Sequence, residues 1–391
     1  MTPRRPKAVV AAGSGGADGL GRRSPRRPKA VVAMSGGVDS SVAAALMVER
    51  GFDVVGIMLK LWRGEAENNA SGCCNVGAAE DARRVAEALG IDFYVLNFAE
   101  RFEDTVVRDF HDSYAAGRTP NPCVRCNQWI KFDALLERAA AFGADVLATG
   151  HYARVRERGG LYRLRRGKDP AKDQSYVLWM LGQGELARCR FPTGEMTKPE
   201  TRALAEELGL RTAHKPDSQE ICFVRGGDVA AYVKERIPEA ARPGPLLDGE
   251  GNLLGEHRGI GRYTVGQRRG LGVSLGVPVF VTAIDKRSNA VTVGPREELA
   301  VLGLATEETS FVAQAPAAGD TLLVQHRVHG EVSRAVVTER SDDGLTVSYE
   351  DPVEGIATGQ SAVFYSADDP DELLGGGVIT ATMRPSVARV S

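Results

Sequence analysis

The stretch that decides the fold is AVVAMSGGVDSS, residues 30–41. AVVAM (30–34) is a short apolar run typical of a buried strand, and an amphipathic helical pattern follows over 40–51. The glycines between them allow backbone N–H groups to converge on an anion, and a helix N-terminus adds partial positive charge. The spacing matches neither a Walker A loop nor G-x-G-x-x-G. The stretch therefore predicts a phosphate-binding loop of another type.

Outward from this loop, the alternation of strand and helix repeats along the chain. Apolar runs predict buried strands at 52–59, 91–98 and 144–150. Amphipathic patterns predict helices at 78–90 and 131–143. Such alternation is typical of an α/β fold, a doubly wound parallel sheet with helices on both faces. Ligands of these sheets bind beyond the carboxyl ends of the strands, which is where the predicted loop lies.

The pattern changes after about residue 225, where helical periods give way to hairpin signals such as LLDGEGNLLG (246–255). Short alternating strands predict a small all-β barrel or sandwich at the C-terminus, with strands at 279–285, 290–294, 321–329, 334–339, 345–350 and 361–366. We expect a disordered N-terminal extension (1–29), a catalytic domain (30–215), a middle domain (216–297) and a β-barrel (298–388). The arginine-rich extension also has the composition of a transit peptide.

Composition narrows the class of protein. The 391 residues are 43% hydrophobic and 26% charged, as in ordinary globular proteins, and no apolar run approaches the ~18 residues that cross a bilayer. Six cysteines without a signal-peptide pattern indicate a reducing compartment, and we expect a cytoplasmic protein without a membrane partner. A net charge of −2 gives no global sign of nucleic acid, but HRGIGRYTVGQRRG (257–270) is locally basic.

Two cysteines, Cys123 and Cys126, form a C-x-x-C pair, and Cys222 lies far downstream. A structural zinc site needs four ligands, and the sequence offers no second pair to complete one. The proline-flanked setting is also unlike a thioredoxin motif. Thiol chemistry on an activated substrate fits better, because a persulfide is a strong nucleophile at neutral pH. A second thiol then releases the product and leaves a disulfide bond for a reductant to reopen.

The loop SGGVDSS (35–41) resembles that of the N-type ATP pyrophosphatase superfamily, whose members adenylate a substrate oxygen and release pyrophosphate. From about residue 30 to 380 the chain resembles one family within it, the tRNA-specific 2-thiouridylases. The motifs that carry this resemblance occur in the family order: AMSGGVDSS, GRTPNPCVRCNQWIKF, LATGHYAR, KDQSYVL, FPTGEMTKPETRALAEELGL, KPDSQEICFV, YTVGQRRGLG, ATGQSAVFY and LLGGGVI.

The resemblance implies a transferase that thiolates the wobble uridine of tRNA with ATP and Mg²⁺, and it implies roles for individual residues. Cys126 is the implied nucleophile and Cys222 the implied persulfide carrier. The implied ATP contacts are Ala33, Met34, Ser35, Gly36, Gly37, Val38, Asp39, Ser40, Met58 and Gly150. The implied tRNA contacts are Asn121, Pro122, His151, Lys172, Asp173, Gln174, Arg327 and Gln360, with Asn121, Pro122 and Cys123 facing the target uracil.

The chain departs from the family pattern at Cys123, where many members carry an acid that is thought to assist catalysis. A general acid–base role is therefore doubtful at this position. Cys123, Cys126 and Cys222 could instead be ligands of an iron–sulfur cluster, so cluster-dependent thiolation is an alternative to the persulfide route. A ligase of the same superfamily acting on a small molecule, and an RNA-binding or iron–sulfur protein without catalysis, are further alternatives.

The resemblance also implies partners. The substrates would be the tRNAs for lysine, glutamate and glutamine, and the sulfur would come from a cysteine desulfurase or a relay protein. The target base must leave the anticodon stack to reach an enzyme pocket. The basic segment 257–270 and the β-barrel would hold the tRNA body through its phosphates and shape.

Overall fold

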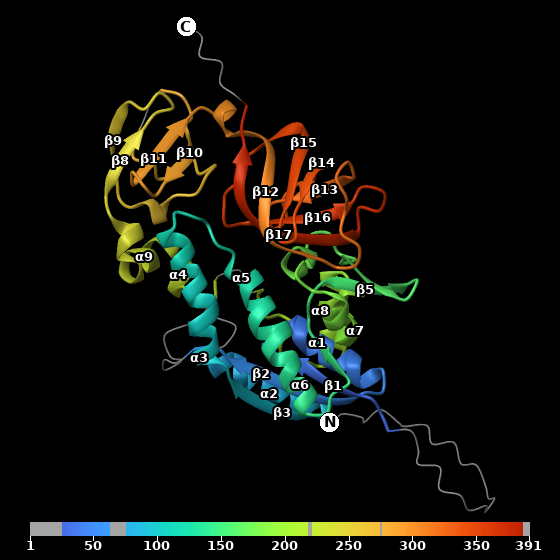
Figure 1. Ribbon diagram of the computed structural model, residues 1–391. Helices are drawn as coiled ribbons and strands as arrows, with labels where there is room; N and C mark the ends of the chain where they lie inside the picture. Colours follow the sequence, from blue (N-terminus) through green and yellow to red (C-terminus); the bar gives the residue numbers. More distant parts are fainter. Residues whose placement is uncertain (1–25, 63–75, 218–220, 274–275, 386–391) are drawn as a thin grey trace, which may run out of the picture.

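The computed structural model describes residues 26–62, 76–217, 221–273 and 276–385. Of the predicted N-terminal extension, residues 1–25 lie outside this part of the chain. Figure 1 shows an α/β unit at the bottom, a small β unit at the upper left and a barrel at the upper right.

The α/β unit is built on a parallel sheet in the order β3-β2-β1-β4-β7 among the described strands. The predicted α/β fold is confirmed. The sheet strands are β1 (Lys29–Ala33), β2 (Asp53–Lys60), β3 (Asp92–Asn97), β4 (Val146–Ala148) and β7 (Cys189–Arg190). The α-helices are α1 (Val38–Glu49), α2 (Val76–Leu89), α3 (Ala99–Phe102), α4 (Arg108–Ala115), α5 (Pro122–Arg125), α6 (Leu135–Ala141), α7 (Gln183–Arg188) and α8 (Lys198–Glu207). The π-helical turns are η2 (Glu103–Val107) and η3 (Cys126–Ala134), and the 3₁₀ turns are η4 (Ser175–Leu178) and η5 (Pro192–Glu195).

Alternate residues of β1 point to opposite faces of this sheet, and each face has its own core. Ala30 and Val32 pack with residues of α1 and α2, whereas Val31 belongs to the cluster that includes Ile130 and Leu135. A strand whose faces are both covered reads as a continuous apolar run because neither face meets water. AVVA had this appearance in the sequence.

The segment with Cys123 and Cys126 is more helical than the sequence indicated. We expected a helix only from residue 131, but the helix begins at Pro122 and continues through η3 and α6. Asn121 is the N-cap, since its side chain accepts a hydrogen bond from the N–H of Val124 at 3.4 Å. Proline is well suited to the first turn of a helix, where its missing N–H costs nothing. Asn121 and Pro122, whose residue types are also common in turns, are therefore the start of a helix.

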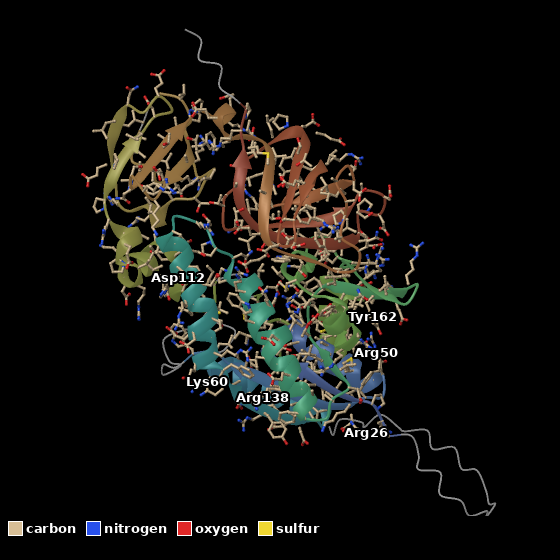
Figure 2. All side chains as sticks on the ribbon, viewed as in Figure 1. Arg26, Arg50, Lys60, Asp112, Arg138 and Tyr162 are labelled. Atoms are coloured by element: carbon tan, nitrogen blue, oxygen red, sulfur yellow. The ribbon has the colours of Figure 1, made fainter. Side chains whose placement is uncertain are left out.

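The continuous helical run of α3, η2 and α4 was not predicted. Its buried side chains recur every four residues at Phe102, Val106, Phe110 and Tyr114. This spacing is the sequence signal for the helix, but the charged residues between these positions obscure it. In Figure 1 the run extends up from the α/β unit and reaches α9 (Val229–Arg236) of the second unit, where His111 Nε2 lies 3.0 Å from the Tyr232 hydroxyl. Asp112, labelled in Figure 2, lies on this end of the helix.

The second unit holds a sheet of four described strands in the order β10-β11-β8-β9, beside helix α9 (Val229–Arg236). The predicted hairpin at 246–255 is confirmed as β8 and β9. The strands are β8 (Gly244–Leu247), β9 (Leu253–His257), β10 (Phe280–Asp285) and β11 (Ala290–Gly294), with 3₁₀ turns η6 (Arg225–Gly227), η7 (Pro238–Ala241), η8 (Ile260–Arg262) and η9 (Arg296–Leu299) nearby.

The third unit is a closed antiparallel barrel of six described strands, which confirms the predicted β-barrel. Two strands that we expected in the barrel, 279–285 and 290–294, are instead β10 and β11 of the second unit. Its order is β12-β15-β14-β13-β16-β17, and pairing of β12 with β17 closes it. A hairpin from the α/β unit, β5–β6, extends the sheet beside β17. The strands are β5 (Ala153–Arg158), β6 (Leu161–Arg166), β12 (Ala300–Phe311), β13 (Thr321–Gln325), β14 (Ser333–Arg340), β15 (Leu345–Glu354), β16 (Ser361–Ser366) and β17 (Glu372–Met383).

Strands β12 and β17 were missing from the sequence prediction. The glycine run in β17 reads as a loop, since glycine disfavours strands unless another group approaches closely. Here that group is Trp179, because a Cβ placed on Gly376 would lie 2.7 Å from the Cγ atom of Trp179. The close approach is a tertiary contact that local sequence does not reveal.

One buried histidine in the barrel makes stability depend on pH. Burial, reinforced by the charge of Arg327, lowers the pKa of His326 to about 4, and its Nδ1 has no hydrogen-bond partner among the described residues. The unfolded chain therefore takes up this proton near pH ~6.5, before the folded protein does. We expect the free energy of unfolding to fall as the pH drops from 6.5 towards 4, by up to ~3 kcal/mol from this residue.

Urea midpoints of the wild type and of His326→Leu at pH 7.0 and 4.5 measure this contribution. The wild type should lose more stability than the variant over this interval. Equal losses in the two proteins would show that His326 is not the titrating group.

Candidate active site

The predicted phosphate loop lies between β1 and α1, at the carboxyl edge of the parallel sheet. Gly36 has a φ of +73°, and a Cβ atom there would lie 2.2 Å from the carbonyl oxygen of Ala78 on α2, so only glycine fits. Ser40 Oγ accepts from the Ser35 N–H at 3.1 Å and donates to the Gly37 carbonyl at 3.1 Å. Gly37, the N-cap of α1, has no side chain to occupy the N–H groups of the first turn. These N–H groups are suited to an anion.

The other residues expected to contact ATP lie at the same edge. Gly150 follows β4, and a Cβ atom there would lie 2.7 Å from the Ser40 backbone nitrogen. The Met34 N–H donates to the Ile57 carbonyl at 2.8 Å, which joins the loop to β2 next to Met58. The structure therefore brings the predicted segments 33–40, Met58 and Gly150 together.

Asp39 is the centre of a polar network that the sequence did not reveal. Lys198 Nζ, at the start of α8, donates to its two carboxylate oxygens at 2.7 and 2.9 Å, and the Tyr152 hydroxyl donates to Oδ1 at 2.8 Å. Lys198 also forms an ion pair with Asp217 at 2.7 Å. Burial raises the pKa of Tyr152, so its hydroxyl stays a donor. The network fixes the carboxylate beside the phosphate loop.

Two more basic residues complete the surroundings of the loop. Lys215 donates to the Gly36 carbonyl at 2.9 Å and to Asp81 at 2.8 Å. Lys172 pairs with Asp217 at 2.8 Å. Burial works to raise the pKa of Asp217, but the hydrogen bonds from Lys172 and Lys198 outweigh burial and lower it. Lys198, Lys215 and Asp217 lie in the motifs TKPE and KPDSQE, for which the sequence predicts no individual roles, whereas Lys172 was expected to contact tRNA.

The thiols lie on two segments that contact neighbouring residues of α4. Cys123 is exposed and Cys126 is buried, and between them Arg125 forms an ion pair with Asp109 at 3.3 Å. Cys222 is half-buried, and the ring of the next residue, Phe223, packs edge-on against Phe110 with centroids 5.0 Å apart. Asp109 and Phe110 are consecutive. One turn of α4 therefore holds both the Cys126 segment and the Cys222 segment.

The described cysteines are all present as thiols, so the disulfide bond expected during turnover is not present in this structure. In the described part of the chain, no group of three or more His, Cys, Asp or Glu side chains is placed to hold a metal ion. Cys123, Cys126 and Cys222 therefore do not form a ready ligand set for an iron–sulfur cluster. The buried Cys189 has a pKa raised to about 12 by burial, which suits packing rather than catalysis.

Several residues expected to contact tRNA have structural partners within the α/β unit. His151 is buried with Nδ1 2.7 Å from the Thr149 hydroxyl, and burial keeps its pKa well below the usual value. Asp173 is buried and accepts hydrogen bonds from the Gly167 and Ser175 N–H groups at 2.9 and 3.1 Å. Gln174 accepts from the Tyr152 N–H at 3.0 Å. A direct contact of Asp173 with RNA would require these bonds to open.

The two expected tRNA contacts in the barrel also have protein partners. Gln360 Nε2 donates to the carbonyls of Thr119 and Pro120 at 2.8 and 3.2 Å, next to Asn121 and Pro122. Arg327 donates to the carbonyl of Gly355. Gln360 thus lies beside segment 121–123, which we predicted to face the uracil. The sequence did not predict this contact, because the two sites are more than 200 residues apart in the chain.

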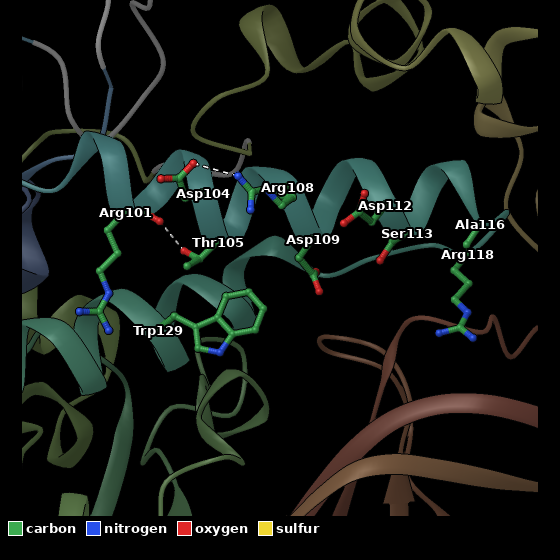
Figure 3. Close-up of a pocket in the computed structure, with 10 residues that line it drawn as sticks. All are labelled: Arg101, Asp104, Thr105, Arg108, Asp109, Asp112, Ser113, Ala116, Arg118 and Trp129. Atoms are coloured by element: carbon green, nitrogen blue, oxygen red, sulfur yellow. Dashed lines mark hydrogen bonds and ion pairs between the residues drawn. The ribbon is translucent and has the colours of Figure 1, made fainter.

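A pocket of about 500 Å³ opens between the α3–α4 run and η3. Figure 3 shows its charged lining along one face of the run, with Trp129 opposite. Several of these charges are paired: Arg108 with Asp104 at 3.1 Å and Arg101 with Asp133 at 2.6 Å. Arg118, at the far end of the pocket, directly precedes the Thr119–Pro122 segment. The pocket therefore borders the segment with Cys123.

This arrangement defines the class of protein: a nucleotide-binding α/β enzyme of the ATP pyrophosphatase type, with a β-barrel appended. Three family models match consecutive segments that together cover most of the chain. The models described as tRNA methyl transferase HUP domain, tRNA methyl transferase PRC-barrel domain and aminomethyltransferase beta-barrel domain match residues 28–226, 230–295 and 301–379.

Curated relatives identify the family. A protein of Clostridium perfringens named tRNA-specific 2-thiouridylase MnmA is 44% identical over 353 residues, which cover 90% of this chain and 98% of the relative. Proteins of the same name from Roseiflexus castenholzii and Geobacter metallireducens are 47% and 48% identical, covering 88% and 90% of this chain and 97% and 96% of theirs. The chain belongs to the tRNA-specific 2-thiouridylase family, a family of sulfurtransferases.

Among solved structures, a 4-thiouridine synthetase–RNA complex with bound ATP is 17% identical and covers 54% of this chain and 51% of its own, with a TM-score of 0.34. A likeness this weak says nothing about function. None of the described helices has the length and apolar character needed to cross a membrane.

Proposed function

We propose that the protein is a tRNA-uridine 2-sulfurtransferase that adenylates O2 of the wobble uridine and replaces this oxygen with persulfide sulfur. The family membership supports the overall reaction. The observation that carries the thiol part is the convergence of the Cys126 and Cys222 segments on consecutive residues of α4, Asp109 and Phe110. Two distant cysteines attached to one helical turn are suited to act on one substrate atom.

The first step uses the phosphate loop. ATP binds with its phosphates at the start of α1, the uridine O2 attacks the α-phosphate, and pyrophosphate leaves. Lys198 and Lys215 contact the loop and supply positive charge for the leaving pyrophosphate. Carboxylate oxygens suit Mg²⁺, and Asp39 is the residue that would hold the ion against the phosphates. Its oxygens now accept from Lys198, so the ammonium group must share or yield them.

The second step moves sulfur. The terminal sulfur of a persulfide on Cys222 attacks C2, the C2–O bond breaks and AMP leaves, so the base is joined to Cys222 through an S–S bond. The Cys126 thiolate attacks the Cys222 sulfur and the S–S bond breaks. The 2-thiouridine departs and a Cys126–Cys222 disulfide forms, which an external thiol reductant returns to two thiols. A sulfur donor, such as a cysteine desulfurase or a relay protein, reloads Cys222.

We assign the tRNA to the face formed by the barrel and the basic segment 257–270. Arg258, Arg262, Arg268 and Arg269 of this segment are exposed, as residues that contact a phosphate backbone should be. Asn121, Pro122 and Cys123 would face the flipped uracil, and the exposed side chain of Cys123 suits this position. The substrates would be the tRNAs for lysine, glutamate and glutamine, and the reaction would take place in the cytoplasm. Residues 30–215 would form the catalytic domain.

One reconstitution tests the proposal. Unmodified lysine tRNA is incubated with the protein, ATP, Mg²⁺, a cysteine desulfurase and cysteine, and digested nucleosides are analysed by mass spectrometry while pyrophosphate is measured. We expect 2-thiouridine and pyrophosphate in equal amounts, both dependent on tRNA.

The same assay separates the alternatives. A small-molecule ligase would make no 2-thiouridine and would release pyrophosphate no faster with tRNA than without it, and a binding protein would release none. The persulfide route and the cluster-dependent route are compared by measuring thiolation with protein purified anaerobically, with and without reconstituted iron and sulfide. Thiolation that appears only in the iron-loaded sample would overturn the persulfide route in favour of a cluster.

A further inference from the structure

Arg125 lies between the two cysteines of the C-x-x-C pair. It connects the thiol-bearing helix, which consists of α5 and η3, to the barrel. Its buried guanidinium donates to the two carboxylate oxygens of Glu308 on β12, each at 2.7 Å. It also pairs with Asp109 on α4 at 3.3 Å and stacks over Trp129 at 4.7 Å from the ring centroid. One side chain therefore joins α4, the thiol-bearing helix and the barrel.

The barrel strand is distorted where it supplies this partner. Glu308 has a φ of +51°, in the left-handed region that non-glycine residues seldom adopt. The pairing of β12 with β17 changes register between Glu307 and Ser310. Such bulges re-aim a side chain at some cost in backbone energy, and here the re-aimed group is the Glu308 carboxylate. The local strain is explained by the contact with Arg125.

A second contact from the barrel holds the segment just before the thiols. The Thr119 N–H donates to the Thr358 carbonyl at 2.9 Å, and Gln360 donates to the carbonyls of Thr119 and Pro120. Gly359 has a φ of +89°, and a Cβ atom there would lie 2.9 Å from the Thr119 carbonyl oxygen. The barrel turn and the segment are thus in direct backbone contact.

We propose that Arg125 is a positioning residue and that the barrel, through Glu308 and Gln360, fixes Cys126 in the orientation needed for sulfur transfer. The inference rests on the proposed function. The barrel is then part of the machinery that aligns the thiols, in addition to any contact with RNA. Because a displacement of about 1 Å can reduce a rate ~100-fold, loss of the Arg125–Glu308 contact should slow sulfur transfer while ATP chemistry continues.

The test is Glu308→Gln, with Asp369→Asn as the matched control. Asp369 is also a barrel-side carboxylate that accepts two hydrogen bonds from an arginine of the α/β unit, Arg165, at 2.5 and 3.0 Å. That arginine lies on β6, in the hairpin that extends the barrel sheet beside β17, and not on the thiol-bearing helix. We expect Glu308→Gln to lower kcat for thiolation by ~10- to 100-fold, with the affinity for tRNA and the single-turnover rate of pyrophosphate release within ~2-fold of wild type. Asp369→Asn should leave all three unchanged.

A readout independent of activity is the alkylation rate of Cys126 by iodoacetamide, followed by peptide mass spectrometry. Cys126 is buried, so the wild type and Asp369→Asn should react slowly there, and Glu308→Gln should react faster. Equal Cys126 rates in all three proteins, or equal kcat losses in both variants, would overturn the proposal. A wild type that makes no 2-thiouridine contradicts the proposed function instead, while the alkylation comparison still decides whether the barrel positions Cys126.

Discussion

Replacing Cys126 by serine is expected to abolish 2-thiouridine formation, by at least ~1,000-fold, while the first turnover still releases pyrophosphate. Adenylation needs only the phosphate loop, so ATP is still consumed in the first turnover. The persulfide of Cys222 can still attack C2, but serine cannot resolve the S–S bond. A protein–tRNA adduct should therefore accumulate when external thiols are absent.

The adduct is detected as a protein band of reduced mobility that labelled tRNA marks and that dithiothreitol dissolves. Cys222→Ser should release pyrophosphate but form neither adduct nor product, because the sulfur carrier is missing. Cys189→Ser is the matched control: this cysteine is buried, its pKa is raised to about 12, and its replacement should leave thiolation intact. Full activity of Cys126→Ser without added thiol would contradict the assigned role.

The second large effect is expected for Asp39→Asn, which should lower tRNA-dependent pyrophosphate release by ~100- to 1,000-fold. The substitution keeps the shape of the side chain but removes the charge that we assign to Mg²⁺. It also removes one of the two carboxylates that Lys198 contacts, which disturbs the ammonium group beside the phosphates. No 2-thiouridine should then form, because adenylation precedes sulfur transfer.

Asp145→Asn is the control for this experiment. Asp145 accepts a hydrogen bond from the Lys29 N–H at 2.7 Å, at the opposite end of β1 from Asp39. Both variants lose a carboxylate close to an end of β1, but only Asp39 lies at the ligand-binding edge. Pyrophosphate release by Asp39→Asn at more than half the wild-type rate, with unchanged thermal unfolding, would remove Asp39 from the mechanism.

Much of the α/β unit follows from local sequence. The run AVVA predicts a strand buried on both faces because its alternate residues, Ala30 and Val31, each enter a core. The glycines after it predict the loop, because Gly36 needs a positive φ. By contrast, β17 was missed because its glycines are explained only by the approach of Trp179. The helical start at Pro122 was missed because proline is favoured both in turns and in first helical turns.

The sequence by itself determined the strand–loop–helix unit, the family resemblance and which cysteines are candidates for catalysis. Each of these is encoded within a few consecutive residues. Tertiary structure alone decided which distant groups meet: Lys198 with Asp39, Arg125 with Glu308, and Gln360 with Thr119. The physical reason is that ion pairs and hydrogen bonds act over a few ångströms in space. Their partners here are separated by more than 150 residues of chain, and only the packed fold brings them within that range.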